Sequence, residues 1–126
     1  MSTRSTIEIQ RKDGSQQRIY AHWNGYLAHN GHILYHKYDT AEKVEELIAL
    51  GNISFLGDTP DECVAYHRDG YEDLKFWEND EEYNYSFNEK TGIWTVRFMD
   101  SNHVMVEMPL GKALEEYVDL AKSLYG

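Results

Sequence analysis

The sequence predicts an α+β fold in which two helices cover a mainly antiparallel sheet of about five to six strands. Three features lead to this prediction: two hairpin patterns, a run of helical spacing near 40–50, and a second such run near 111–124. A length of 126 residues suits a single domain, 1–126, that is just large enough to bury a core.

The first hairpin pattern lies at the start of the chain. Apolar and polar residues alternate on both sides of Asp13-Gly14, a strong tight-turn signal. We expect strands near 5–11 and 17–23, with Asn24-Gly25 ending the second strand.

The first helix is expected near 40–50. Asp39 has the side chain of an N-cap, and Glu42 stands where a capping box needs an acid. Apolar residues then recur at helical spacing until Gly51. Residues 29–38 are compatible with a preceding helical turn that starts irregularly at Asn30-Gly31.

The rest of the chain predicts a second hairpin and a terminal helix. Glu89-Lys90-Thr91-Gly92 separates two alternating segments, and one face of the last segment is apolar at helical spacing. We expect a helical turn at 59–62, strands at 64–67, 83–88, 93–99 and 103–108, and a helix at 111–124.

Composition restricts the class of function. Twenty-two acids against 12 bases give a formal charge of −10, which repels the phosphates of nucleic acid and favours a basic protein partner or simple solubility. The single cysteine, Cys63, fits a reducing cytoplasm, and neither a signal peptide nor a membrane-spanning run is expected. No motif indicates a cofactor.

The segment 18–36 holds four of the six histidines, together with Trp23 and several tyrosines. Rings with an apolar face and a polar edge are typical of ligand sites, and arginine adds a partner for phosphate. The alternative is that Trp23 and Tyr26 belong to the core, which the sequence favours for Trp23. The candidate ligand-binding residues are Arg4, Arg18, Tyr20, His22, Trp23, Asn24, Tyr26 and Arg97.

Three further clusters carry weaker signals. His29, His32 and His36 would share a face if their segment were helical, which suits zinc, although histidines in a surface turn explain the pattern better. Tyr66-His67-Arg68-Asp69 offers acid–base groups but is equally typical of a turn. The acidic run from Tyr71 to Tyr83 suits a solvated loop or a surface that mimics nucleic acid.

The motifs together resemble a set of small, largely uncharacterised phage and prophage proteins. The residues that carry the resemblance span most of the chain: Ser2-Thr3-Arg4-Ser5-Thr6-Ile7, Asp13-Gly14, Ile19-Tyr20-x-His22-Trp23-x-Gly25-Tyr26, Leu47-Ile48-x-Leu50-Gly51 and Glu82-Tyr83-Asn84-Tyr85. The chain departs from the pattern at Ala21 and Asn24, where the family has Cys and Asp.

The resemblance implies an accessory protein that counters host defence by stoichiometric binding in the host cytoplasm. The expected partner is a small nucleotide signal, held by a homo-oligomer without turnover or cofactor. The first alternative is an acidic inhibitor of a host defence protein, through nucleic-acid mimicry or in the manner of an anti-CRISPR protein. The second is a small metal-assisted hydrolase using His29, His32, His36 or His67.

Overall fold

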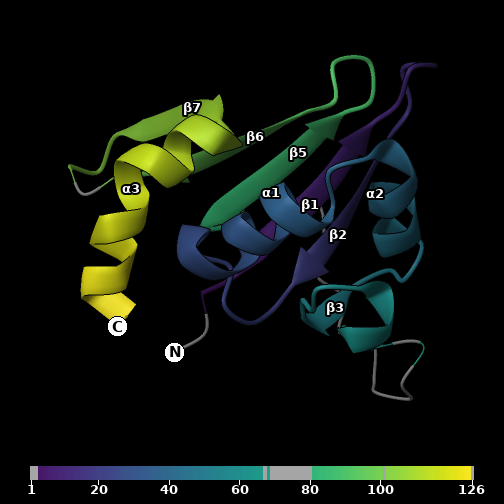
Figure 1. Cartoon of the computed structure of the whole chain (residues 1–126), viewed down its shortest axis with the longest axis horizontal. Coiled ribbons are helices and arrows are strands. Elements are labelled where there is room, and N and C mark those ends of the chain that lie inside the picture. Colours follow the sequence, from purple (N-terminus) through teal and green to yellow (C-terminus); the bar gives the residue numbers. More distant parts are fainter. Residues whose placement is uncertain (1–2, 67, 69–80, 101, 126) are drawn as a thin grey trace.

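The computed structural model describes residues 3–66, 68, 81–100 and 102–125, and their side chains as far as 117. Seven strands form one sheet in the order β4-β3-β2-β1-β5-β6-β7. The helices α1 and α2 lie on one face of this sheet, and α3 packs beside β6 and β7 (Figure 1). The predicted α+β class is therefore confirmed.

Most strands lie where alternation predicts them. The second hairpin, β5–β6, has the predicted bounds, whereas β2 ends two residues earlier than expected. The strands are β1 (Ser5–Gln10), β2 (Gln16–Ala21), β3 (Ile53–Phe55), β4 (Val64–Ala65), β5 (Tyr83–Asn88), β6 (Ile93–Met99) and β7 (Met105–Pro109).

The sheet has more strands than predicted and is mixed. β1 pairs in parallel with β5, and β2 pairs in parallel with β3, while the other neighbouring strands are antiparallel. The strand β3 escaped prediction because three residues are too few to show alternation. Parallel pairing joins segments that are distant in sequence, so no local sequence pattern predicts it.

The described part of the chain has three α-helices, one more than the two predicted. A π-helical turn, Leu27–Gly31, leads into α1 (His32–Lys37), and then come α2 (Ala41–Ile48) and α3 (Leu110–Tyr125). The segment 29–37 is thus helical, with the irregular start that Asn30-Gly31 indicated, and Tyr38 ends it.

The predicted cap of α2 is wrong by one residue. The hydroxyl of Thr40, in extended conformation, accepts a hydrogen bond from the Lys43 N–H, so Thr40 is the N-cap. Asp39 instead forms an ion pair with the Lys43 ammonium at 3.0 Å. Glu42 is therefore not at the capping-box position.

The core fills the space between the sheet and the helices. On each central strand, alternate side chains point to this layer, and the helices supply the facing apolar residues. Its fully buried members include Ile7, Ile9, Leu34, Val44, Leu47, Tyr85, Phe87 and Leu110.

One buried hydrogen bond ties the loop after β2 to the middle of the sheet. The Tyr85 hydroxyl donates to the carbonyl of Gly25 at 2.6 Å, and the Gly25 N–H donates to the Thr3 carbonyl at 2.7 Å. A Cβ at Gly25 would lie 2.8 Å from the Ser5 Cβ and the Thr3 oxygen, so only glycine allows this close approach. The candidate residues next to Gly25 are thereby fixed against β1.

Candidate functional site

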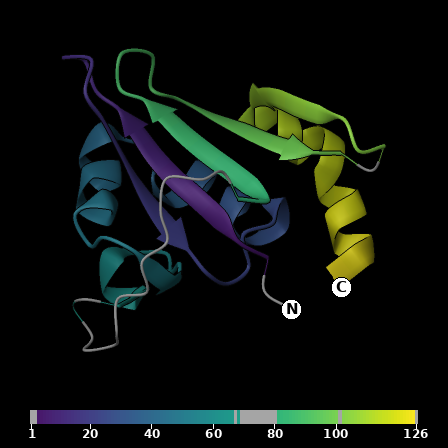
Figure 2. The same ribbon diagram turned by 180° about the vertical axis from the view of Figure 1, so that it is seen from behind.

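The face of the sheet opposite α1 and α2 is polar. Seen from this side, the central strands β2, β1, β5 and β6 run across the middle of the molecule (Figure 2). The same alternation that buries Ile7 and Ile9 directs Glu8 to this face, beside Arg18 of β2 and Ser86 of β5. We call it the polar face.

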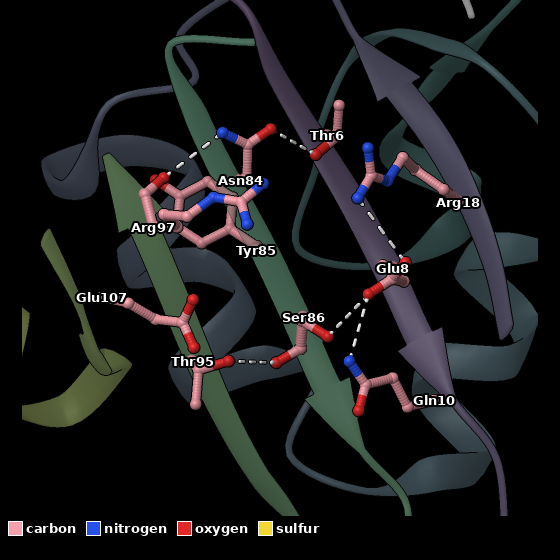
Figure 3. Close-up of a pocket in the computed structure, with 10 residues that line it drawn as sticks. All are labelled: Thr6, Glu8, Gln10, Arg18, Asn84, Tyr85, Ser86, Thr95, Arg97 and Glu107. Atoms are coloured by element: carbon pink, nitrogen blue, oxygen red, sulfur yellow. Dashed lines mark hydrogen bonds and ion pairs between the residues drawn. The ribbon is translucent and has the colours of Figure 1, made fainter. Parts of the chain in front are cut away.

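A hollow of about 90 Å³ lies at the centre of the polar face. Arg18 enters it from β2 and Arg97 from β6, on either side of the polar side chains of β1 and β5 (Figure 3). The residues that line it are Thr6, Glu8, Gln10, Arg18, Asn84, Tyr85, Ser86, Thr95, Arg97 and Glu107.

Glu8 organises one side of the hollow. Its carboxylate accepts hydrogen bonds from the Ser86 hydroxyl at 3.0 Å and the Gln10 amide at 3.3 Å, and it pairs with the Arg18 guanidinium at 3.6 Å (Figure 3). Such a network holds the guanidinium in a defined orientation.

Asn84 organises the other side. Its amide oxygen accepts from the Thr6 hydroxyl at 2.9 Å, and its amide nitrogen donates to the carbonyls of Glu81 and Arg97. The Arg97 side chain lies beside Asn84, and Glu107 is the cross-strand neighbour of Arg97 on β7 (Figure 3). The hollow therefore has one arginine and one glutamate on each flank.

Tyr20 lies beyond Arg18 on the same side of β2, and His22 follows directly after the end of this strand. The Tyr20 hydroxyl and His22 Nδ1 are hydrogen-bonded at 2.8 Å. Burial raises the pKa of Tyr20 to about 12, and burial together with the nearby charge of Arg4 lowers the pKa of His22. At neutral pH the pair is therefore a phenol and a neutral imidazole, suited to hydrogen bonding rather than to charge pairing.

The structure reverses the expected roles of two rings. Tyr20 is only 3% exposed, so its ring is not a stacking surface, whereas Trp23, which the sequence favoured as core, is 45% exposed. The reason is that β2 ends at Ala21, so the alternation of faces does not extend to Trp23. The Trp23 ring meets His22 edge-on, with centroids 4.7 Å apart.

The loop that carries His22 and Trp23 is held by a buried asparagine. Asn30 donates to the Ser5 hydroxyl at 3.1 Å, and its N–H donates to the carbonyl of Asn24 at 3.2 Å. Asn24 has a φ of 58°, in the left-handed region that asparagine tolerates. Asn24 thus shapes the turn, and Tyr26 is half-buried against His29 with ring centroids 6.3 Å apart.

The three histidines proposed for zinc do not converge. His29 lies in the π-helical turn, where its ring is hydrogen-bonded to the Asn30 amide oxygen at 2.8 Å and packs on Phe55. His32 and His36 remain together, with ring centroids 4.4 Å apart. Within the described part of the chain, no group of three His, Cys, Asp or Glu side chains is placed to hold a metal.

The structure describes only part of two further predicted clusters, the acid–base group at 66–69 and the acidic run from Tyr71 to Tyr83. His67, Asp69 and most of the acidic run, including Glu72, Asp73 and Glu78, lie outside the described residues. Cys63 is buried against the Tyr38 hydroxyl at 3.7 Å, and burial raises the pKa of its thiol, so it is unsuited to act as a nucleophile at neutral pH.

Sequence reasoning missed most of the residues that line the hollow. It named Arg18 and Arg97, which the structure brings to the same site, but not the groups between them. Alternation within the predicted strands contained the signal, since the positions between the apolar residues are polar on neighbouring strands. The missed residues are Thr6, Glu8, Gln10, Asn84, Tyr85, Ser86, Thr95 and Glu107.

Comparison of the chain with protein-family models, curated proteins and solved structures found no match. Among the described residues, no helix has the length and apolar character needed to cross a membrane.

Proposed function

We propose that this chain is a phage or prophage accessory protein that binds a small nucleotide-type ligand without turnover and so withdraws a signal from host defence. One observation carries the proposal: Arg18 and Arg97, far apart in sequence, line the same polar hollow. A guanidinium is well suited to phosphate because it donates two parallel hydrogen bonds.

The two carboxylates of the hollow narrow the class of ligand. Glu8 is paired with Arg18, and Glu107 is the cross-strand neighbour of Arg97, so each adds negative charge beside a cation. A carboxylate is also a common acceptor for the hydroxyl of a ribose. The mixture favours a ligand that carries both phosphate and sugar hydroxyls over inorganic phosphate.

A base would lie along β2, towards the exposed ring of Trp23. Arg18 and His22 are four residues apart, or roughly 13 Å at the ~3.3 Å rise of a strand, so the hollow holds only one end of such a ligand. Neutral His22 offers a hydrogen bond to a base, and Trp23 offers a face for stacking, which contributes ~1–3 kcal/mol per base in single-strand binders.

The cellular setting is also part of the proposal. We expect the protein to act in the cytoplasm of the infected cell, as a homo-oligomer. A single buried thiol is compatible with a reducing compartment, and the charge of −10 argues against direct binding to nucleic acid.

The charge supports one alternative. A chain with 22 acids and 12 bases suits an inhibitor of a basic host defence protein. Such binding would weaken steeply with salt, because exposed charges are screened over about 8–10 Å at physiological ionic strength.

The test compares three arginine variants. Arg18→Ala and Arg97→Ala are titrated calorimetrically with linear and cyclic adenine and guanine nucleotides, beside Arg11→Ala as control, since Arg11 pairs with Glu45 away from the hollow. We expect a loss of about tenfold or more for the first two and none for Arg11→Ala, because a charge-assisted pair contributes about 1.5–3 kcal/mol. Equal binding by all three variants would refute the hollow as the site.

A further inference from the structure

Two histidines of α1 lie side by side on the helix side of the sheet. His32 and His36 are exposed and stand four residues apart, so they occupy one side of the helix. Their ring centroids are 4.4 Å apart, with the planes inclined by 53°. The helix lies on the opposite side of the sheet from the polar face (Figure 1).

This spacing is close to that of two rings on one metal ion. With Zn–N bonds of about 2.0–2.1 Å and angles of about 90–110°, the centroids of two ligating imidazoles lie about 4.5–5.2 Å apart. The observed separation of 4.4 Å lies just below this range, and both side chains are exposed. Histidines at positions i and i+4 of a helix are a known zinc-binding arrangement.

The surroundings leave room for an ion and its waters. His36 lines a groove of about 510 Å³, together with Tyr35, Asp39 and Trp94. Hydrogen bonding to Lys43 lowers the pKa of Asp39, and the Lys43 ammonium pairs with this carboxylate at 3.0 Å, so Asp39 is polar lining of the groove with its charge already balanced. The protein as a whole, at −10, also attracts a divalent cation.

From this geometry we propose that His32 and His36 form a two-point chelate for a divalent transition-metal ion of the zinc type. Two imidazoles supply two of the four ligands that zinc prefers, and water fills the remaining positions. The ion lies at the rim of the groove, because His36 belongs to both. This site is independent of nucleotide binding on the polar face.

The experiment is a calorimetric titration of the metal-free full chain with zinc chloride. We expect one equivalent to bind, and His32→Ala and His36→Ala each to weaken binding by about tenfold or more, because two linked ligands act at high effective concentration. His103→Ala is the matched control, since His103 is exposed in the turn before β7 and should leave binding unchanged.

A second measurement locates the ion. Cobalt(II) substitution should broaden NMR signals of α1 in the native chain and not in the His32→Ala/His36→Ala double variant. Circular dichroism verifies that the variants are folded. Absence of zinc binding by the native chain, or binding that persists in the double variant, would overturn the proposal.

Discussion

The two faces of the sheet are built from the same strands and differ in chemistry. On β1, Ile7 and Ile9 enter the core, while Glu8 between them belongs to a network of polar side chains around a hollow. Substitutions on the helix side should therefore cost stability. Substitutions on the polar face should cost binding, and the following predictions test that division.

The largest effect on stability is expected from Ile7→Ala. Ile7 is fully buried, and removing its side chain leaves a cavity, so unfolding free energy should fall by about 2–5 kcal/mol in urea denaturation. Gln10→Ala, on the same strand but exposed, should change it by less than about 0.5 kcal/mol. Similar losses for both variants would contradict the division between faces.

Next comes Tyr85→Phe, which removes the hydroxyl that donates to Gly25. The Gly25 carbonyl is then left buried without that donor, at an expected cost of about 1–3 kcal/mol in the same assay. Tyr35→Phe is the control, because Tyr35 is 43% exposed and removing its hydroxyl should change the unfolding free energy little. A Tyr85→Phe variant as stable as native would show that the loop after β2 is held by other contacts.

The core on the helix side of the sheet contains a buried thiol, so the stability of the protein should decrease in alkali. Burial raises the pKa of the Cys63 thiol above its ordinary 9.0. At a pH between the pKa of the unfolded state and that of the folded state, the thiol is protonated in the native protein and deprotonated in the unfolded one. Stability should therefore fall as pH rises above about 9. In Cys63→Ala this part of the decline should be absent; an unchanged pH profile would assign it to the buried tyrosines instead.

The smallest stability change is expected on the polar face. Arg97→Ala removes a half-exposed side chain from the rim of the hollow, and unfolding free energy should change by no more than about 1 kcal/mol. Thermal denaturation measures this shift. A loss as large as that of Ile7→Ala would mean that the arginine serves the fold rather than a ligand.

How far the sequence predicts this molecule depends on the range of each interaction. The hairpin Tyr83–Asn88 with Ile93–Met99 follows from local alternation and a turn signal, and its bounds agree with prediction. The parallel contacts of β1 with β5 and of β2 with β3 join distant segments, so local patterns did not reveal them.

The candidate site also depends on contacts between distant segments, which local sequence patterns do not predict. Arg18 and Arg97 could be named singly from residue type, but only the strand order brings them to one hollow. Trp23 is exposed rather than buried because β2 ends at Ala21, an end that local alternation did not predict. Likewise, the π-helical turn at Leu27–Gly31 separates His29 from His32 and His36.

The measurement that tests the central claim most directly is native mass spectrometry of the protein purified gently from host cells with an active defence system. The proposed function predicts an additional mass of a small molecule that is released by denaturation and is missing from Arg18→Ala/Arg97→Ala. Native protein that carries no such mass, or a mass retained by the double variant, would contradict ligand capture at the hollow of the polar face.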